Sequence, residues 1–243
     1  MRNVIVIFIF NVFTLTAYAQ GEYNVWCFGD SVRLDFNAGL PPVVSTSSFT
    51  NGFPGATICD KSGNLLFYAD RDSVWDSSHT RMLNGDSISN ANPTQGLNIL
   101  PFPCNDSLYY LFSYIIASNG STTGGQWILY YSIINTNGNS GLGEIIVKNV
   151  LMDTNLTLGF GMTRHSNNRD YWITYQIADT NIFYSRLIST AGIGSPIVSQ
   201  LGLNKAGPAT GGPGSLEFSM NATTLVSCDG FGQTIQYYSL KFK

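Results

Sequence analysis

The sequence predicts an all-β protein, and composition and local patterning both support this fold class. Charged residues make up 11% of the 243 residues, against about a quarter in a typical globular protein. The chain instead has 25 glycines and 13% aromatic residues, a mixture typical of many short strands joined by polar turns. Long runs of helix-forming residues at the helical period are missing. A tandem repeat of strands, described below, is the third observation.

The first 19 residues are typical of a secretory signal peptide. Arg2 precedes an apolar run from Val4 to Leu15, and Ala17-Tyr18-Ala19 forms a small-residue cleavage site. The run is short for a membrane span of about 20 residues. We therefore expect export through the periplasm, a secreted or cell-surface location, and no integral membrane span after leader removal. The folded domain is expected to cover residues 20–243.

Strand-forming segments recur, and each follows a polar turn rich in Asn, Asp and Ser. The segments are Leu65–Ala69, Leu108–Phe112, Asp170–Thr174 and Thr224–Cys228. The turns before them are Asp60–Asn64, Cys104–Ser107, Ser166–Asp170 and Met220–Thr223. Because Asn, Asp and Ser side chains bond to their own backbone in turns, Asp60 is interpreted as a turn residue rather than a catalytic acid. The aromatic pairs that recur in the strands are interpreted as core packing.

A second strand follows at a regular distance in three of these units. Tyr130-Tyr131-Ser132, Phe183-Tyr184-Ser185 and Tyr237-Tyr238-Ser239 lie 53 and 54 residues apart. A repeat of this kind favours radial stacking of small sheets. We therefore predict a β-propeller-like array of about four visible blades, at residues 23–95, 96–152, 153–203 and 204–243. Whether the ring is complete stays open, and a β-sandwich is the alternative. Residues 24–28 are expected to be a strand that could complete the last blade.

The four cysteines, Cys27, Cys59, Cys104 and Cys228, suit one or two disulfides or buried thiols. Three pairings are possible and spacing does not choose among them. There is no Cys-x-x-Cys pair, so a zinc site is not predicted. The segment 118–125 is an extended hairpin loop, interpreted either as a flexible tip or as a ligand contact.

The order of several short motifs resembles a family of secreted WD-repeat-like β-propeller domains of Bacteroidetes. The motifs are Asn24-Val-Trp-Cys-Phe-Gly29, Leu34-Asp-Phe-Asn37, Cys59-Asp-Lys-Ser-Gly-Asn-Leu-Leu-Phe-Tyr68, Val74-Trp75, Asn84-Gly85, Thr94-Gln95, Tyr109-Tyr-Leu-Phe112, Tyr131-Ser132, Gly141-Leu-Gly-Glu144, Lys148-Asn149, Asp170-Tyr-Trp172 and Gly214-Ser-Leu-Glu-Phe-Ser219. Such domains are often linked to gliding-motility or type IX secretion modules. The resemblance implies a surface location and supplies no catalytic motif. Met220-Asn221 departs from the family's Pro-Asp-Gly turn, and the relatives are longer, so whether this chain is a fragment stays open.

Two functions are compatible with these residues. The favoured one is a non-enzymatic binding or scaffold module for an extracellular protein or polysaccharide. The alternative is a carbohydrate-active hydrolase with paired carboxylates. The carboxylates considered for that role are Asp70, Asp72, Asp76, Glu144 and Glu217.

Other patterns in the sequence give weaker indications. A His165–Asp170 pair is expected to cap a hairpin, and Gly211–Ser215 lacks the spacing of a nucleophile elbow. A calcium site at Asp70, Asp72 and Asp76 is a minor alternative. No catalytic residue, metal site or cofactor is assigned, and the ligand-binding residues stay unknown. The net charge of -3 gives no support for nucleic-acid binding.

Overall fold

The computed structural model describes residues 21–50, 55–88, 96–117, 126–205, 215–228 and 235–239. The expected signal peptide and the loop at 118–125 lie outside these residues. The prediction of an all-β fold is confirmed, because strands dominate the described chain and fall into several antiparallel sheets. None of the helices in these ranges is long and apolar enough to cross a membrane.

Two three-stranded sheets come first, and both lie within the first expected unit. A short 3-10 helix, η1 (Gly21–Tyr23), leads into them. The first sheet has the order β1-β2-β3 and the second β4-β5-β6. The strands are β1 (Val25–Phe28), β2 (Val32–Asp35), β3 (Val43–Thr46), β4 (Ala56–Cys59), β5 (Leu65–Ala69) and β6 (Val74–Asp76).

A large eight-stranded sheet follows, and a small sheet of order β15-β16-β17 ends the described chain. The large sheet has the order β13-β12-β11-β10-β9-β8-β7, and β14 pairs with β12. Its strands are β7 (Leu97–Pro101), β8 (Leu108–Ala117), β9 (Gln126–Asn135), β10 (Glu144–Arg164), β11 (Tyr171–Ile177), β12 (Thr180–Ser189), β13 (Gly192–Ile193) and β14 (Ile197–Lys205). The last strands are β15 (Ser215–Phe218), β16 (Thr224–Cys228) and β17 (Ile235–Ser239), and a short helix, α1 (Gly138–Gly141), precedes β10.

The large sheet forks at Leu156 in β10. Before this residue β10 pairs with β9, and Leu156 itself lies opposite Trp127 of β9 and Ile177 of β11. Beyond it, β10 pairs with β11 only. Several register shifts interrupt the pairing with β9, and such irregularities bend and twist a strand. The boundary expected between residues 152 and 153 therefore falls inside one continuous strand.

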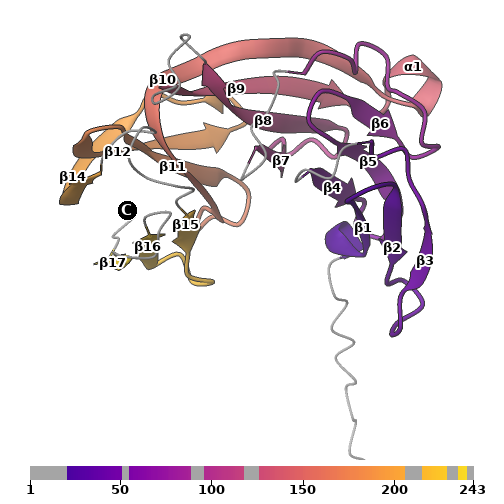
Figure 1. The fold of residues 1–243 in the computed structure, drawn as a ribbon, viewed down its shortest axis with the longest axis horizontal. Helices are drawn as coiled ribbons and strands as arrows, with labels where there is room; N and C mark the ends of the chain where they lie inside the picture. The colour runs from indigo at the N-terminus through magenta and orange to yellow at the C-terminus, as the bar shows by residue number, and fades with distance from the viewer. Residues whose placement is uncertain are drawn as a thin grey trace, which may run out of the picture.

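The sheets follow one another along an open arch, with β1–β3 at one end and β15–β17 at the other (Figure 1). A separate hydrophobic core lies between each sheet or strand group and the next one along the arch. The groups are β1–β3, β4–β6, β7–β10, β10–β12 with β14, and β15–β17. In β8, Tyr109 and Leu111 join the core shared with β4–β6, while Tyr110 and Phe112 join the core shared with β10–β12. The described strands do not close into a ring (Figure 1), so the propeller remains an expectation.

A polar network supports the fork. The Tyr175 hydroxyl donates to Asp153 Oδ2 at 2.7 Å, and Arg186 donates to the same oxygen at 3.0 Å and to the Tyr175 oxygen at 2.7 Å. These three residues come from β11, β10 and β12 respectively. Arg186 also donates to the carbonyl of Gly194 at 3.0 Å. The network ties β10 to the unit that begins beyond the fork.

We expect Arg186→Met to lower the free energy of unfolding by roughly 1–3 kcal/mol, because partly buried acceptors lose a charged donor. Lys61→Met, which breaks the exposed ion pair with Asp106, is the matched control and should cost less than about 1 kcal/mol. Chemical denaturation of both variants measures the difference. Equal losses in the two variants would show that the network does not support the fork.

Candidate functional site

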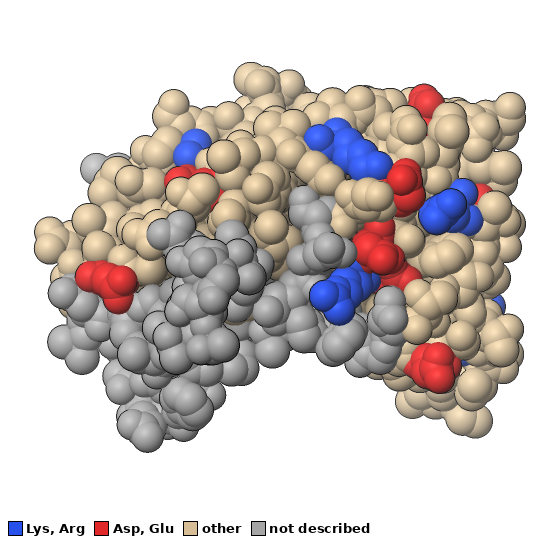
Figure 2. Space-filling view, turned by 45° about the horizontal axis from the view of Figure 1, so that its top comes forward, with Lys and Arg blue, Asp and Glu red and all other residues tan. Residues whose placement is uncertain are grey.

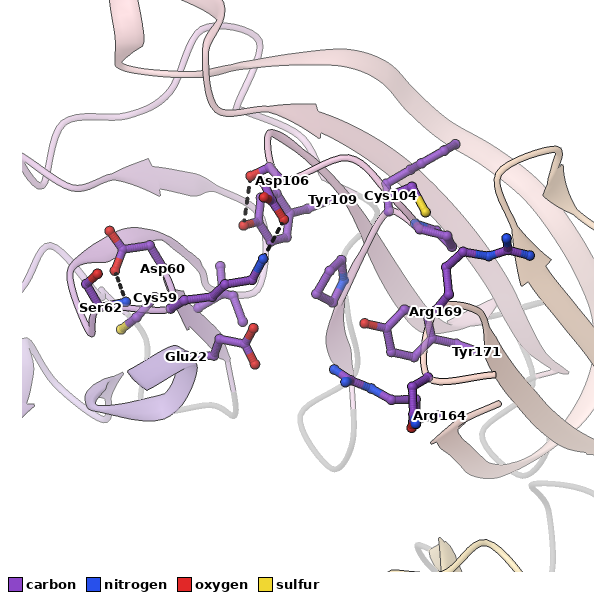
Figure 3. Close-up of a pocket in the computed structure, with 16 residues that line it drawn as sticks. Glu22, Cys59, Asp60, Ser62, Cys104, Asp106, Tyr109, Arg164, Arg169 and Tyr171 are labelled. Atoms are coloured by element: carbon purple, nitrogen blue, oxygen red, sulfur yellow. Dashed lines mark hydrogen bonds and ion pairs between the residues drawn. The ribbon is translucent and has the colours of Figure 1, made fainter. Parts of the chain in front are cut away.

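The hairpin turns of three successive units meet around one cavity of about 420 Å³. The turns are those between β4 and β5, β7 and β8, and β10 and β11, and η1 completes the wall (Figure 3). The lining residues are Glu22, Ile58, Cys59, Asp60, Lys61, Ser62, Pro101, Phe102, Pro103, Cys104, Asp106, Tyr109, Arg164, Asn168, Arg169 and Tyr171. A volume of this size is within the range of small-molecule sites.

The same side-chain contact shapes each of these turns. Asp60 Oδ1 accepts the backbone N–H groups of Ser62 and Asn64, at 2.8 and 2.9 Å. Equivalent contacts join Asn105 to Ser107 and Asn167 to Arg169 in the other two turns, both at 3.0 Å, and Asn221 to Thr223 at 3.2 Å in the β15–β16 turn, which does not line the cavity. The interpretation of Asp60 as a turn residue agrees with these bonds. Each turn thus satisfies part of its own backbone through one side chain.

Most of the charged groups on the cavity wall have a partner within the chain. Lys61 Nζ lies 2.9 Å from Asp106 Oδ1, and Arg169 Nε lies 2.9 Å from Asp170 Oδ1. The hydrogen bond and charge of Arg169 lower the pKa of the Asp170 carboxyl below its usual value. These two pairs offset the charges of Lys61 and Arg169.

Glu22 and Arg164 are different, because neither makes an ion pair with any described residue. They reach the cavity from opposite sides, Glu22 from η1 and Arg164 from the end of β10 (Figure 3). The Arg164 guanidinium lies over the ring of Tyr171, 5.6 Å from its centroid. This cation–π contact fixes the guanidinium at the edge of the cavity.

The floor of the cavity is largely apolar. Ile58 and Tyr109 are buried, and Phe102 is partly buried and stacks on Tyr110 with ring centroids 5.1 Å apart. Burial, together with nearby carboxylates including Asp106, raises the pKa of Tyr109 to about 12. Tyr109 is therefore neutral at physiological pH, and its hydroxyl donates to the Asp106 carbonyl at 3.3 Å.

The acidic stretch from Asp70 to Asp76 builds turns rather than a reactive centre. Asp70 is fully buried, and it accepts the Trp75 indole N–H and the Ser73 backbone N–H, both at 3.0 Å. Asp76 is 2% exposed and accepts the backbone N–H and the hydroxyl of Ser78, at 2.8 and 2.6 Å. Donors of the chain thus surround both carboxylates, where a bound cation would need them free.

The remaining candidate carboxylates lie away from the cavity. Asp72, Glu144 and Glu217 belong to the β5–β6 turn, the start of β10 and β15 respectively, and none of them lines it. Within the described ranges, no three His, Cys, Asp or Glu residues are placed to hold a metal ion. No described pair of these carboxylates is therefore assembled in this cavity.

His165 and Asp170 cap the β10–β11 hairpin, as expected from the sequence. The His165 N–H donates to the Asp170 carbonyl at 2.8 Å, and the Asn167 N–H donates to His165 Nδ1 at 3.1 Å. Of the Gly211–Ser215 segment, only Ser215 lies within the described residues.

Cys27, Cys59 and Cys104 are free thiols in this structure. Cys27 and Cys59 are buried in one core between the first two sheets, while Cys104 is exposed at the cavity and Cys228 is half-buried at the end of β16. Burial raises the pKa of the Cys27 thiol to about 11. This arrangement agrees with the buried-thiol interpretation for Cys27 and Cys59.

Sequence reasoning did not single out Glu22, Arg164 or Tyr171 as site residues. Glu22 lies in η1, while Arg164 and Tyr171 lie at strand ends, and Glu22 and Arg164 are far apart in the chain. The recurrence of the turns was the available signal, because equivalent turns of stacked repeats gather at one edge. Comparisons with protein-family models, curated proteins and solved structures found no match to this chain.

We predict that Asp60→Asn removes a pH-dependent part of the free energy of unfolding. The turn itself should be kept, because the equivalent turns have Asn at this position. Burial alone would raise the pKa of Asp60, but hydrogen bonds from Asn64 and Ser62 outweigh it and lower the pKa. This stabilisation is complete above the unfolded value of about 3.9 and is lost as pH falls through the lower folded value.

Thermal melts of both proteins at a series of pH values between neutral and strongly acidic measure this effect. The advantage of the wild type over Asp60→Asn should shrink on acidification, and the converse change Asn105→Asp should add acid sensitivity. If the difference in melting temperature between the wild type and Asp60→Asn stayed constant at all pH values, Asp60 would not have the lowered pKa assigned to it.

Proposed function

We propose that this chain is a secreted or cell-surface binding or scaffold module, non-enzymatic, which presents one edge of a β-propeller-like array to a protein or polysaccharide. The observation that carries the proposal is the meeting of three successive hairpin turns around the cavity. Loops on a rigid β scaffold are the usual place for binding residues. The low charge and the expected leader support an extracellular setting.

The stacking of units supports the propeller-like part of the proposal. Each successive pair of units shares its own core, from Val25 and Tyr68 at one end to Phe183 and Leu225 at the other. The fork at Leu156 joins two four-stranded groups, β7–β10 and β10–β12 with β14. A strand that leaves one group and begins the next suits radial repetition. The resemblance to secreted WD-repeat-like domains, and with it a type IX secretion or gliding-motility context, belongs to the same proposal.

The charges of the cavity favour binding over hydrolysis. A glycosidase needs two carboxyl groups facing the scissile bond. Of the three acidic residues that line the cavity, Asp60 bonds to its turn and Asp106 to Lys61, which leaves Glu22. The hydrolase alternative therefore has less support from the described cavity than the binding module has.

The surface also gives no support for a polyanionic partner. On the face shown in Figure 2, charged side chains are few, and red and blue groups lie near each other rather than in a patch of one sign. Nucleic-acid binding needs a concentrated basic surface. A protein or a polysaccharide remains the proposed class of partner.

Export is tested by the N-terminus of the protein recovered outside the cell. We expect a chain that begins at Gln20, and an Ala19→Arg variant that keeps its leader, because the cleavage site needs small residues. N-terminal sequencing and intact mass of both proteins measure this. A wild-type chain that stays in the cytoplasm with its first 19 residues would contradict the proposed location.

Binding is tested on arrays of extracellular glycans and peptides with the leader-free chain. We expect Ser62→Trp to weaken any binding at least about tenfold, a loss of about 1.4 kcal/mol, because Ser62 lines the cavity. Ser77→Trp, an equally exposed change in the turn after β6, is the matched control. Binding that survives Ser62→Trp would exclude this cavity, and release of new reducing ends from a bound glycan would favour the hydrolase.

A further inference from the structure

The cavity holds one carboxylate and one guanidinium that the described chain leaves without an ion pair. Glu22 and Arg164 point into the cavity from opposite walls (Figure 3). Arg164 is exposed and Glu22 is half-exposed, so both remain open to a ligand. The two groups therefore offer a ligand one negative and one positive contact.

Most of the neighbouring charged groups have partners of their own, although, beside the hydrogen bond with Asp106, the charge of Glu22 also acts on Lys61 and helps to raise its pKa. Lys61 is paired with Asp106, Arg169 is paired with Asp170, and Asp60 bonds to backbone N–H groups. A ligand with only a negative charge would be repelled by the Glu22 carboxylate. A ligand with only a positive charge would be repelled by the Arg164 guanidinium. A ligand with both charges matches the two walls, because specificity comes from complementary charges together with repulsion of the wrong ones.

The surface between the two charges suits an apolar body. Ile58, Phe102 and Pro103 contribute to the lining between the β4–β5 and β10–β11 turns. Three aromatic rings of the lining each contact another protein group: Tyr171 contacts Arg164, Phe102 stacks on Tyr110, and Tyr109 makes an edge contact with Phe67. Two opposite charges across a partly apolar surface match the two charged ends of a peptide, whereas a neutral saccharide offers no charge to either wall.

From these contacts we propose that the cavity binds a short peptide with a free ammonium group and a free carboxylate, the ammonium at Glu22 and the carboxylate at Arg164. This inference rests on the proposed binding function and names the ligand chemistry of the same cavity. Arginine suits the second role, because its planar guanidinium donates two parallel hydrogen bonds to a carboxylate. The Tyr171 ring beneath it holds that plane in place.

Isothermal titration of the leader-free chain at about pH 6.5 tests the inference, since a peptide amine with a pKa of about 7.7–8.0 is charged there. The probes are leucyl-phenylalanine, its N-acetyl derivative and its C-terminal amide. We expect the free dipeptide to bind about tenfold more tightly than either blocked form, since each lost charged hydrogen bond carries about this factor. Arg164→Gln should make the dipeptide and its amide bind equally, and Glu22→Gln should do the same for the dipeptide and its N-acetyl form.

Lys148→Gln is the matched control, because Lys148 pairs with Asp86 outside the cavity, and it should keep the preference for the free dipeptide. Arg164→Lys, which keeps the charge, should keep part of that preference. Thermal melts confirm that the variants are folded. Equal binding of all three probes, or no binding of any while the arrays yield a Ser62-dependent ligand, overturns this inference and leaves the binding function standing. Arrays without any ligand, together with no binding of any of the three probes, would overturn both.

Discussion

The whole structure depends on the alternation of side chains along strands that are buried on both faces. In β8, Tyr109 and Leu111 enter one core and Tyr110 and Phe112 enter the next. Alternate residues of a strand point to opposite faces of the sheet. A run of successive apolar residues can therefore pack against the neighbouring sheets on both faces at once. No unit of this kind can bury both faces alone, so each needs the next one.

The fork at Leu156 turns this stacking into an arch with aligned turns. One strand, β10, leaves the group of β8 and β9 and begins the group of β11 and β12, so their orientation is set by the bends in that strand. The bond of Asp153 to Tyr175 and Arg186 crosses the same junction. The hairpin turns at the start of each group then lie at one edge, where they meet around the cavity (Figure 3).

Local features of this fold could be predicted from the sequence, and long-range ones could not. The segments Leu65–Ala69 and Thr224–Cys228 coincide with β5 and β16, because turn chemistry and β-rich runs are local signals. The division of residues 23–95 into two sheets depends on which strands pair with each other. A short segment of sequence carries no information about that pairing. The sequence did not predict the site for the same reason. Glu22 and Arg164 line the same cavity only because sheets that are far apart in the chain stack side by side.

At the cavity, the residues that shape the turns differ from the residues that carry unpaired charges. Asp60, Asn105 and Asn167 satisfy the turn backbone and are thereby committed to structure. Glu22 and Arg164 are not among the residues that make these turn bonds. Lys61 and Arg169 form ion pairs with Asp106 and Asp170, so their charges are partly offset. Glu22 and Arg164 form no ion pair with a described residue, so in the proposed function their charges can interact with a ligand. A repeat protein can thus keep one scaffold and vary its ligand through a few positions beside its turns.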